Sequence, residues 1–470
     1  MPLREVQVPA FPLDRFVPYI GDERFDAFQR GADRTRRLLG ERTVWNLNST
    51  ASGGGVAEML HVLLAYERGM GLDVRWMVLP GNPRFFAITK YLHHLLHGSD
   101  PRPGAELDDH AVYDEVAKET AEELRRLLLP GDVVILHDPQ TAGLIPLLVG
   151  EGVTTIWRCH IGADRENDAT RRGWEFLEPY LTGADAYVFS RSDYIPTAPR
   201  LEPVVIVPPS IDPFAPKNQD LDAESVAAIV TRIGLIEQFD AGTPRFVRSD
   251  GSPGRVDRHA RIVRHGGPTP IGAPLVVQVS RWDPLKDMTG VLHAFADHLD
   301  DDDIHLALVG PDPTSVSDDP EGVEVLAECE ETWRRLPERL RRRIQLVCLP
   351  MDDVEENAVM VNAIQRFTTV VVQKSLAEGF GLTVTEAMWK ARPIVASSVG
   401  GIPDQIDDGS HGVLVDPQDG QQFTAAVRSL LDEPERAMHL GANARTRVRE
   451  QFLCDRHLSQ YAELLDSLLT

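Results

Sequence analysis

The chain has 470 residues, with 48 Lys and Arg against 72 Asp and Glu and a formal net charge of −24. A chain of this length holds roughly two or three domains, and its 42% hydrophobic and 26% charged residues are typical of a globular protein rather than a disordered one. The negative charge argues against binding to nucleic acid or to an anionic membrane surface, whereas a small anionic substrate responds only to the local charge of its site.

Cysteine usage and hydropathy indicate the compartment. The four cysteines are scattered and form no CxxC pair, so neither a zinc cluster nor a disulfide framework is expected. The first residues lack the apolar stretch of a signal peptide, and no run of about 18 apolar residues indicates a membrane span. We therefore expect a reducing, cytoplasmic location.

Short apolar runs alternate with amphipathic segments in the first half of the chain. Helices are expected at 56–68 and 109–129. Strands are expected at 44–48, 74–79, 132–137, 154–160, 186–190 and 204–208. Runs of Val, Ile and Leu suit strands that are buried on both faces of a parallel sheet. The alternation predicts a doubly wound α/β fold.

Residues 210–273 interrupt this alternation of strands and helices and contain no convincing strand. A helix is expected at 223–236, and residues 240–272 then carry six arginines, namely Arg245, Arg248, Arg255, Arg258, Arg261 and Arg264. We interpret this stretch as an inter-domain connection with a long loop. It could instead line a cleft and meet an anion, or cover a dimer contact.

The strand rhythm resumes in the second half. Strands are expected at 274–280, 304–310, 344–349, 370–373, 394–397 and 412–415, and a last helix at 449–469. We expect two Rossmann-like domains, 1–212 and 273–450, joined by 213–272. Because ligands of open α/β sheets bind beyond the carboxyl ends of the strands, two such edges that face each other would form one site in the cleft between the domains.

The turn after the first strand is rich in small residues. Asn46–Gly55 includes Ser52 and ends in three glycines, Gly53, Gly54 and Gly55, immediately before the helix. Glycine lets the backbone approach a ligand closely, and the free N–H groups of a helix start attract an anion. The turn is neither GxGxxG nor a Walker A loop, so it does not indicate a dinucleotide or ATP. We favour a ligand-contacting loop over a merely flexible turn.

Two further motifs follow strands of the second half. Arg281 and Lys286 come directly after 274–280 and suit phosphate oxygens, although solvated surface cations would leave the same pattern. After 370–373, the glycine-bearing turn at Glu378 leads into a helix that carries Glu386. Backbone N–H groups at such a helix start suit a diphosphate, and carboxylates accept hydrogen bonds from vicinal hydroxyls. The alternative is a helix cap and an ordinary surface glutamate.

These motifs resemble a known family. E-G-F-G-L-T-V-T-E-A at 378–387 and S-R-W-D-P-L-K-D at 280–287 resemble the retaining nucleotide-sugar transferases of glycosyltransferase family 4, which have the two-domain GT-B fold. Residues 44–58, 137–140, 157–160 and 208–213 are similar to the trehalose-forming branch of that family. The resemblance covers about 40–450.

The resemblance implies a role for each matching residue. Arg281 and Lys286 would bind the donor diphosphate, Glu378 would hold the donor glucose, and His160 would position the hydroxyls of the transferred sugar; these four form the expected catalytic set. Glu386 would bind the ribose. The other expected donor-binding residues are Gly54, Gly55, Gly379, Phe380, Gly381 and Leu382. The expected acceptor-side residues are Asn48, Asp138 and Gln140.

The same resemblance implies the reaction. Residues 1–212 would be the acceptor-side domain and 273–450 the nucleotide-sugar domain, with the helix within 451–470 crossing back to the first. Glucose would pass, with retention of configuration, from UDP-, ADP- or GDP-glucose to glucose and form trehalose, with no metal or other cofactor. Partners would be these small molecules, and a homodimer is left open. The alternatives are a trehalose phosphorylase, a transferase with another acceptor, and a non-catalytic sugar-nucleotide-binding protein.

Two patterns resemble metal sites but favour another interpretation. His93 and His97 share a helix face, yet no carboxylate completes a motif such as HExxH, so we expect a polar helix face. Asp300–Asp303 precedes a strand rather than following one, and we interpret it as a solvated turn.

Overall fold

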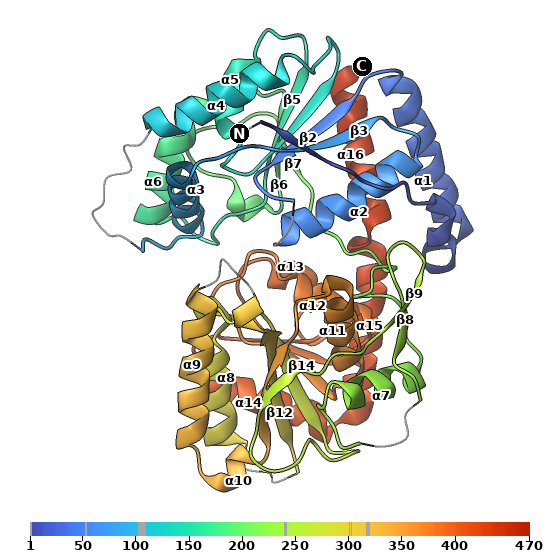
Figure 1. Ribbon diagram of the computed structural model, residues 1–470, viewed down its shortest axis with the longest axis vertical. Coiled ribbons are helices and arrows are strands. Elements are labelled where there is room, and N and C mark those ends of the chain that lie inside the picture. Colours follow the sequence, from blue (N-terminus) through green and yellow to red (C-terminus); the bar gives the residue numbers. More distant parts are fainter. Residues whose placement is uncertain are drawn as a thin grey trace. The chain divides into compact units, whose positions relative to one another are not determined.

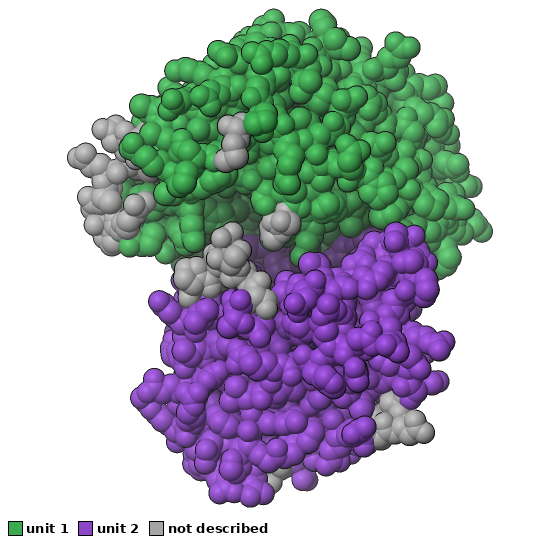
Figure 2. Space-filling view, in the orientation of Figure 1, with its two compact units in different colours: residues 1–210, 452–470 green, residues 211–451 purple. Residues whose placement is uncertain are grey.

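The computed structural model describes residues 2–51, 54–101, 110–238, 242–299, 301, 303–315 and 320–470. The chain divides into two compact units (Figure 2). Unit 1 comprises Met1–Ser210 and Phe452–Thr470, and unit 2 comprises Ile211–Gln451. The chain therefore passes from one unit to the other twice, and its last residues belong to the first unit.

Unit 1 is built on a seven-stranded sheet of order β1-β3-β2-β4-β5-β6-β7 (Figure 1). Its strands are β1 (Arg4–Val6), β2 (Val44–Asn48), β3 (Val74–Val78), β4 (Val133–His137), β5 (Thr154–Cys159), β6 (Ala186–Phe189) and β7 (Val204–Ile206). All neighbours pair in parallel except β1, which pairs with β3 in the antiparallel sense. The parallel order changes direction at β2 and β4, so a ligand site is expected beyond their carboxyl ends.

Helices cover both faces of this sheet. They are α1 (Val17–Leu39), α2 (Gly55–Gly69), α3 (Pro83–Leu96), α4 (His110–Leu124), α5 (Ile145–Leu148), α6 (Asp168–Leu177) and α16 (Cys454–Leu469). One buried cluster joins the strands to α3–α6, and another joins them to α1, α2 and α16. The last helix runs beside α1 (Figure 1). Its Tyr461, Leu464 and Leu465 are buried there, and each such side chain contributes roughly 1.5–3 kcal/mol when fully buried.

Unit 2 repeats the plan with a sheet of order β10-β13-β12-β11-β14-β15-β16. Its strands are β10 (Arg261–Val263), β11 (Leu275–Val279), β12 (His305–Pro311), β13 (Ile344–Leu349), β14 (Val370–Gln373), β15 (Ile394–Ser397) and β16 (Val413–Val415). Only β10 among these is antiparallel to its neighbour. The order of the parallel strands reverses between β11 and β14, which is the switch point of a classical dinucleotide-type sheet.

The helices of unit 2 also lie on both faces of its sheet. They are α7 (Ala223–Arg232), α8 (Met288–His298), α9 (Pro320–Arg335), α10 (Glu338–Arg341), α11 (Val354–Phe367), α12 (Leu382–Trp389), α13 (Ile402–Gln405), α14 (Gly420–Asp432) and α15 (Pro434–Gln451). One buried cluster contains residues of α8, α9 and α14, and the other contains residues of α7 and α11. The strand residues alternate between the two clusters, as Val276 and Val277 do.

The doubly wound α/β prediction is confirmed. All twelve strands predicted from apolar runs are present, with ends that differ by no more than two residues. Two predictions about the rest of the chain are wrong. The last helix does not begin at Arg449, because α15 ends at Gln451 and α16 begins at Cys454 after a break at Phe452 and Leu453. The predicted helix 223–236 ends at Arg232.

The expectation that residues 210–273 lack strands is also wrong. This segment contains β8 (Arg245–Val247) and β9 (Pro253–Arg255), which form an antiparallel hairpin, and β10, which extends the main sheet of unit 2 beside β13. These strands have three residues each and are rich in Arg, so they show no apolar run. We call residues 242–272 the arginine insertion; Asp240 and Ala241, which the prediction included, lie outside the described residues.

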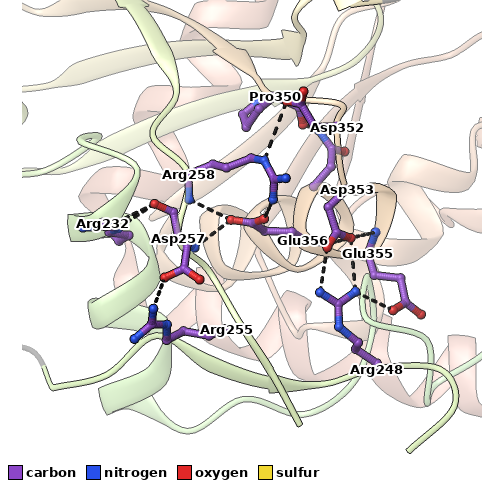
Figure 3. A network of polar contacts seen from close by, with 11 residues as sticks. Arg232, Arg248, Arg255, Asp257, Arg258, Pro350, Asp352, Asp353, Glu355 and Glu356 are labelled. Atoms are coloured by element: carbon purple, nitrogen blue, oxygen red, sulfur yellow. Dashed lines mark hydrogen bonds and ion pairs between the residues drawn. The ribbon is translucent and has the colours of Figure 1, made fainter. Parts of the chain in front are cut away.

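The arginine insertion is not a plain loop, because its arginines pair with acidic residues of unit 2 (Figure 3). Arg248 bridges Asp353 at 2.6 Å and Glu355 at 3.0 Å, while Arg258 pairs with Glu356. These carboxylates lie at the N-cap and first turn of α11, where negative charge is favoured by the helix dipole. The arginine insertion therefore compensates the negative charge of the carboxylates at the start of α11.

Candidate active site

The loops of unit 2 that follow β11 and β14 lie on either side of its switch point. Arg281 and Lys286 follow β11, and Lys286 ends the short 3₁₀ helix η5 (Pro284–Lys286). Glu378 follows β14 in the turn that leads to α12. The sheet order thus places both predicted motifs at the edge where a ligand of an open α/β sheet binds.

Lys286 and Glu378 form the central ion pair of this edge. Lys286 Nζ lies 2.6 Å from Glu378 Oε1, and their side chains are 16% and 10% exposed. Ser375 Oγ donates to Glu378 Oε2 at 3.1 Å. Such charge-assisted bonds fix the orientation of both groups. A cation and a carboxylate 92 positions apart are therefore held together at one place in the fold.

A buried glutamine joins the two loops and had no signal in the sequence. Gln278 of β11 is fully buried; its Nε2 donates to the Lys286 carbonyl at 2.6 Å, and its Oε1 accepts from the Lys374 N–H at 2.9 Å. The Lys374 side chain pairs with Asp287, the N-cap of α8, which has a left-handed backbone (φ 50°). Together these contacts set the relative position of the loops that follow β11 and β14.

The glycine turn before α12 is fixed by its neighbours. Gly381 is the N-cap of α12 with φ 85°, and the Gly401 N–H donates to the Gly379 carbonyl at 2.7 Å. A Cβ atom on Gly400 would lie 1.8 Å from the Glu378 carbonyl oxygen. Gln405 Nε2 donates to the Phe380 carbonyl. The backbone amides at the start of α12 are thus held in a defined loop, as anion binding requires.

The remaining predicted residues of unit 2 differ in exposure. Arg281 is 68% exposed and pairs with Asp283 at 3.2 Å. Glu386, on α12, is buried, and its Oε1 lies 3.6 Å from Lys217 Nζ. Lys217 lies near the beginning of unit 2, before α7, and had no signal in the sequence. Lys390 donates to the Glu386 carbonyl, and burial lowers the pKa of this lysine to about 7.

Unit 1 gathers polar residues at the carboxyl ends of β4 and β5. The His160 N–H donates to Asp138 Oδ1 at 2.7 Å, and Asp138 has a left-handed backbone (φ 64°). Burial raises the pKa of Asp138 to about 7. Gln140 lies two residues further along the same turn and is partly exposed. The structure therefore brings the predicted His160 and Asp138 together.

A chain of side-chain hydrogen bonds ends at the His160 ring. The Nδ1 atom of His137 lies 3.0 Å from the Nε2 atom of His160. On the other side of the ring, the Nε2 atom of His137 lies 3.0 Å from the Oδ1 atom of Asn46. Burial and the nearby Arg158 guanidinium lower the pKa of His137 to about 3 and keep the pKa of His160 well below its usual range. Because Asn46 Oδ1 only accepts, a neutral His137 donates to it and accepts from His160.

Arg158, His137 and Asn46 were not among the predicted site residues. Arg158 is fully buried on β5 and donates to the carbonyls of Phe189 at 3.0 Å and Val207 at 2.6 Å. Residues 137–140 and 157–160 did carry the family resemblance, which was the available signal for His137 and Arg158. Because the Nε2 of a neutral His160 donates to His137, its Nδ1 is left as a hydrogen-bond acceptor for a hydroxyl.

The turn after β2 is described only in part. Ser52 and Gly53 lie outside the described residues, while Gly54 (φ 93°) is the N-cap of α2 and Gly55 begins that helix, both exposed. Asn48, predicted for the acceptor side, is buried and holds local structure: its Oδ1 accepts from Trp76 Nε1 at 2.8 Å, and its Nδ2 donates to the Thr50 carbonyl at 2.7 Å.

Two sequence patterns resemble metal sites, the histidines at 93 and 97 and the acidic run at 300–303. The His93 and His97 rings lie 4.5 Å apart, and His97 Nδ1 is 3.1 Å from the Gly162 carbonyl oxygen. Across the described part of the chain, no cluster of three or more His, Cys, Asp or Glu side chains could hold a metal ion. Of the acidic run, Asp300 and Asp302 lie outside the described residues. No described helix has the length and apolar character needed to cross a membrane.

Comparison with known proteins places these sites in context. Residues 46–196 match the family described as "Trehalose synthase, N-terminal domain", and residues 264–447 match "Glycosyl transferases group 1". The solved structure of an α,α-trehalose-phosphate synthase (UDP-forming) from Burkholderia vietnamiensis is similar, with a TM-score of 0.67 and 17% identity over 91% of this chain and 98% of that one. The fold and these matches define a glycosyltransferase with the GT-B fold.

The sequence relatives narrow the class. A trehalose synthase from Rubrobacter xylanophilus is 35% identical over 436 residues, which cover 92% of each chain. A trehalose phosphorylase from Grifola frondosa is more distant, at 24% identity over 93% of this chain and 58% of that protein. The chain belongs to the trehalose synthase family.

Proposed function

We propose that this enzyme transfers glucose from a nucleotide-glucose to free glucose, with retention of configuration, and so forms trehalose. The observation that carries the proposal is the Lys286–Glu378 pair beside the glycine turn of α12, in a chain of the trehalose synthase family. A cation, a carboxylate and the backbone amides of a helix start are the groups that a sugar diphosphate needs.

In unit 2, the cations stabilise the leaving group. As the bond between glucose C1 and the diphosphate oxygen breaks, negative charge grows on the departing nucleotide. Lys286, Arg281 and the N–H groups at the start of α12 oppose that charge, and this stabilisation is greatest in the transition state. Glu378 accepts hydrogen bonds from the hydroxyls of the donor glucose, and Glu386 accepts those of the ribose.

In unit 1, the residues bind hydroxyl groups. Neutral His160 accepts from a hydroxyl of the transferred glucose, while Asp138 and Gln140 bind the acceptor glucose. The acceptor's anomeric hydroxyl attacks C1 on the face that the diphosphate leaves, and its proton passes to the departing phosphate oxygen. This route gives retention without a protein nucleophile. Glu378 and Glu386 therefore do not act as the acid and base of a glycosidase.

A donor screen tests this function. The protein is incubated with glucose and UDP-, ADP- or GDP-glucose, and the released nucleotide and the disaccharide are quantified together. We expect one donor to give equal amounts of nucleotide and a non-reducing disaccharide. No product with any donor would contradict the proposal. Breakdown of trehalose that needs phosphate but no nucleotide would assign the phosphorylase activity that the distant relatives' name describes.

A further inference from the structure

We propose that the arginine insertion forms a second binding site, separate from the donor site, for a small phosphate monoester such as a sugar phosphate. The observation is a cavity of about 930 Å³ in unit 2, lined by the end of α7, by residues between Gly234 and Gln238 and by the arginine insertion. Its volume lies in the range of pockets that bind small molecules. Its lining contains neither the loops after β11 and β14 nor any residue of α12.

The charge of the cavity selects an anion. Its lining includes three arginines, Arg232, Arg255 and Arg264, together with His259. Two carboxylates oppose them: Asp257 in the lining, and Glu224 beside Gly242. The wall is thus cationic in a chain whose net charge is −24, and such a local excess of positive charge attracts anionic ligands.

The guanidinium groups are held in place before any ligand arrives. Arg232 donates to the Asp257 carbonyl through Nε at 3.1 Å and Nη2 at 2.6 Å. Arg255 pairs with the Asp257 carboxylate at 2.6 Å, and Arg264 donates to the Gly234 carbonyl at 2.7 Å. Figure 3 shows Arg232 and Arg255 both reaching Asp257. Groups that are already ordered lose less entropy when they bind a ligand.

Each guanidinium also keeps donors for a ligand. A guanidinium has five N–H donors, and these contacts use one or two of them in each arginine. The fork of an arginine matches two phosphate oxygens at once. Other arginines of the insertion pair away from the cavity: Arg248 and Arg258 with carboxylates at the start of α11, and Arg261 with Asp312 and Glu330. The arginines in the cavity lining are the ones we expect to contact the phosphate.

The rest of the lining suits the body of such a ligand. Val256 and Ile236 are buried, and together with Ala228 they give the cavity apolar wall. Carbon atoms of a sugar can pack there while the phosphate contacts the arginines. This combination of an apolar surface and a few convergent polar groups favours an organic phosphate over a bare inorganic ion.

The experiment is calorimetric titration of the intact protein with ribose 5-phosphate, and with ribose as the uncharged comparison. We expect ribose 5-phosphate to bind and ribose not to bind. Arg255→Gln and Arg264→Gln should each weaken binding about tenfold, because each removes charge-assisted hydrogen bonds. Asp257→Asn removes an opposing charge but keeps the backbone carbonyl that holds Arg232 and a side-chain oxygen that accepts from Arg255, so it should tighten binding.

Two control variants locate the site. Arg335→Gln also removes an exposed arginine that is paired with a carboxylate, Glu331, and it should leave binding unchanged. Lys286→Ala, at the donor site, should also leave ribose 5-phosphate binding unchanged. Arg255 is 60% exposed, so its replacement is compatible with folding, which thermal unfolding checks. Absence of binding, equal binding by the two cavity variants and wild type, or loss of binding in Lys286→Ala alone would overturn the proposal.

Discussion

Lys286 Nζ and Glu378 Oε1 lie 2.6 Å apart at the edge of the unit 2 sheet where its strand order reverses. The pair is largely buried, so a sugar diphosphate that binds there meets a cation and a carboxylate whose positions are already set. Interactions fixed in advance contribute most to stabilising charge that develops during a reaction.

Lys286 is the cation of the Lys286–Glu378 pair. Lys286→Ala should lower kcat about 10²–10³-fold, because the variant loses a positive charge that we propose stabilises the leaving diphosphate. Steady-state kinetics with the active donor measure this. The matched control is Lys118→Ala, which removes an exposed lysine paired with Asp114 at 3.6 Å and should keep the wild-type rate. A normal kcat in Lys286→Ala would mean that the diphosphate binds elsewhere.

Gly400 packs closely against the carbonyl of Glu378, so its replacement tests whether the position of the loop matters for activity. In Gly400→Ala, the new Cβ would lie 1.8 Å from the Glu378 carbonyl oxygen, so the loop must move. We expect at least a tenfold loss of kcat/KM, corresponding to about 1.4 kcal/mol. Gly409 also has a positive φ (72°, against 56° at Gly400), but a Cβ atom there would have no other atom within 4 Å, so Gly409→Ala is the matched control. It should cost only about 1 kcal/mol of unfolding free energy. Equal activity of the two variants would show that the loop position is unimportant.

Asp138 should make unit 1 less stable as the pH rises. Its folded pKa, near 7, exceeds its ordinary value of 3.8, so between about pH 4 and pH 7 the folded state keeps a proton that the unfolded state has lost. The free energy of unfolding therefore falls through this window. Asp138→Asn should raise it by about 1–2 kcal/mol at pH 8 and change it little at pH 4. Asparagine keeps an acceptor for the His160 N–H and tolerates the positive φ.

Urea unfolding at the two pH values measures this difference, and product formation is followed in parallel. Because Asp138 is also proposed to bind the acceptor, the same variant should raise KM for glucose. A variant that is destabilised at pH 8 would show that the Asp138 carboxylate is stabilised, not penalised, in the folded state.

Arg248 tests the charge compensation at α11. Its hydrogen bonds are the largest cause that lowers the pKa of Asp353 to about 2, so the pair stabilises the fold above about pH 4 and loses this effect as the pH falls towards 2. Arg248→Gln should lower the free energy of unfolding by about 1 kcal/mol at pH 7, since the groups are partly exposed and screened. The deficit should shrink in acid. Arg335→Gln, which breaks an exposed i,i+4 pair, should change stability by less than about 0.5 kcal/mol.

The sequence predicts most of the fold because the twelve core strands are apolar runs, and such runs are unambiguous when helical segments separate them. β1 and the strands of the arginine insertion escape prediction. They have three residues each, and each contains an arginine, so they show no apolar run. β1 and β10 are fixed by pairing with distant segments, as Arg261 is with Cys348, whereas β8 and β9 pair with each other. A three-residue strand has no periodicity to detect.

The candidate site divides in the same way. Arg281, Lys286, Glu378 and His160 stand in motifs, so a single chain suggests them. Gln278 contacts Lys374, 96 residues away, and Gln405 contacts Phe380, 25 residues away. Both glutamines hold the loops of the candidate site, and neither has a local pattern. Asn48 is the opposite case, because it stands in a motif but its side chain holds local structure. It accepts from Trp76 and donates to the Thr50 carbonyl.

The most direct test of the central claim is the identity of the product formed from glucose labelled with ¹³C at C1 and an unlabelled nucleotide-glucose. NMR of the disaccharide reports both anomeric centres. We expect α,α-trehalose with one labelled and one unlabelled anomeric carbon, formed in step with nucleotide release and strongly reduced in Lys286→Ala. A product with inverted configuration at the transferred glucose, or no disaccharide with any donor, would contradict it.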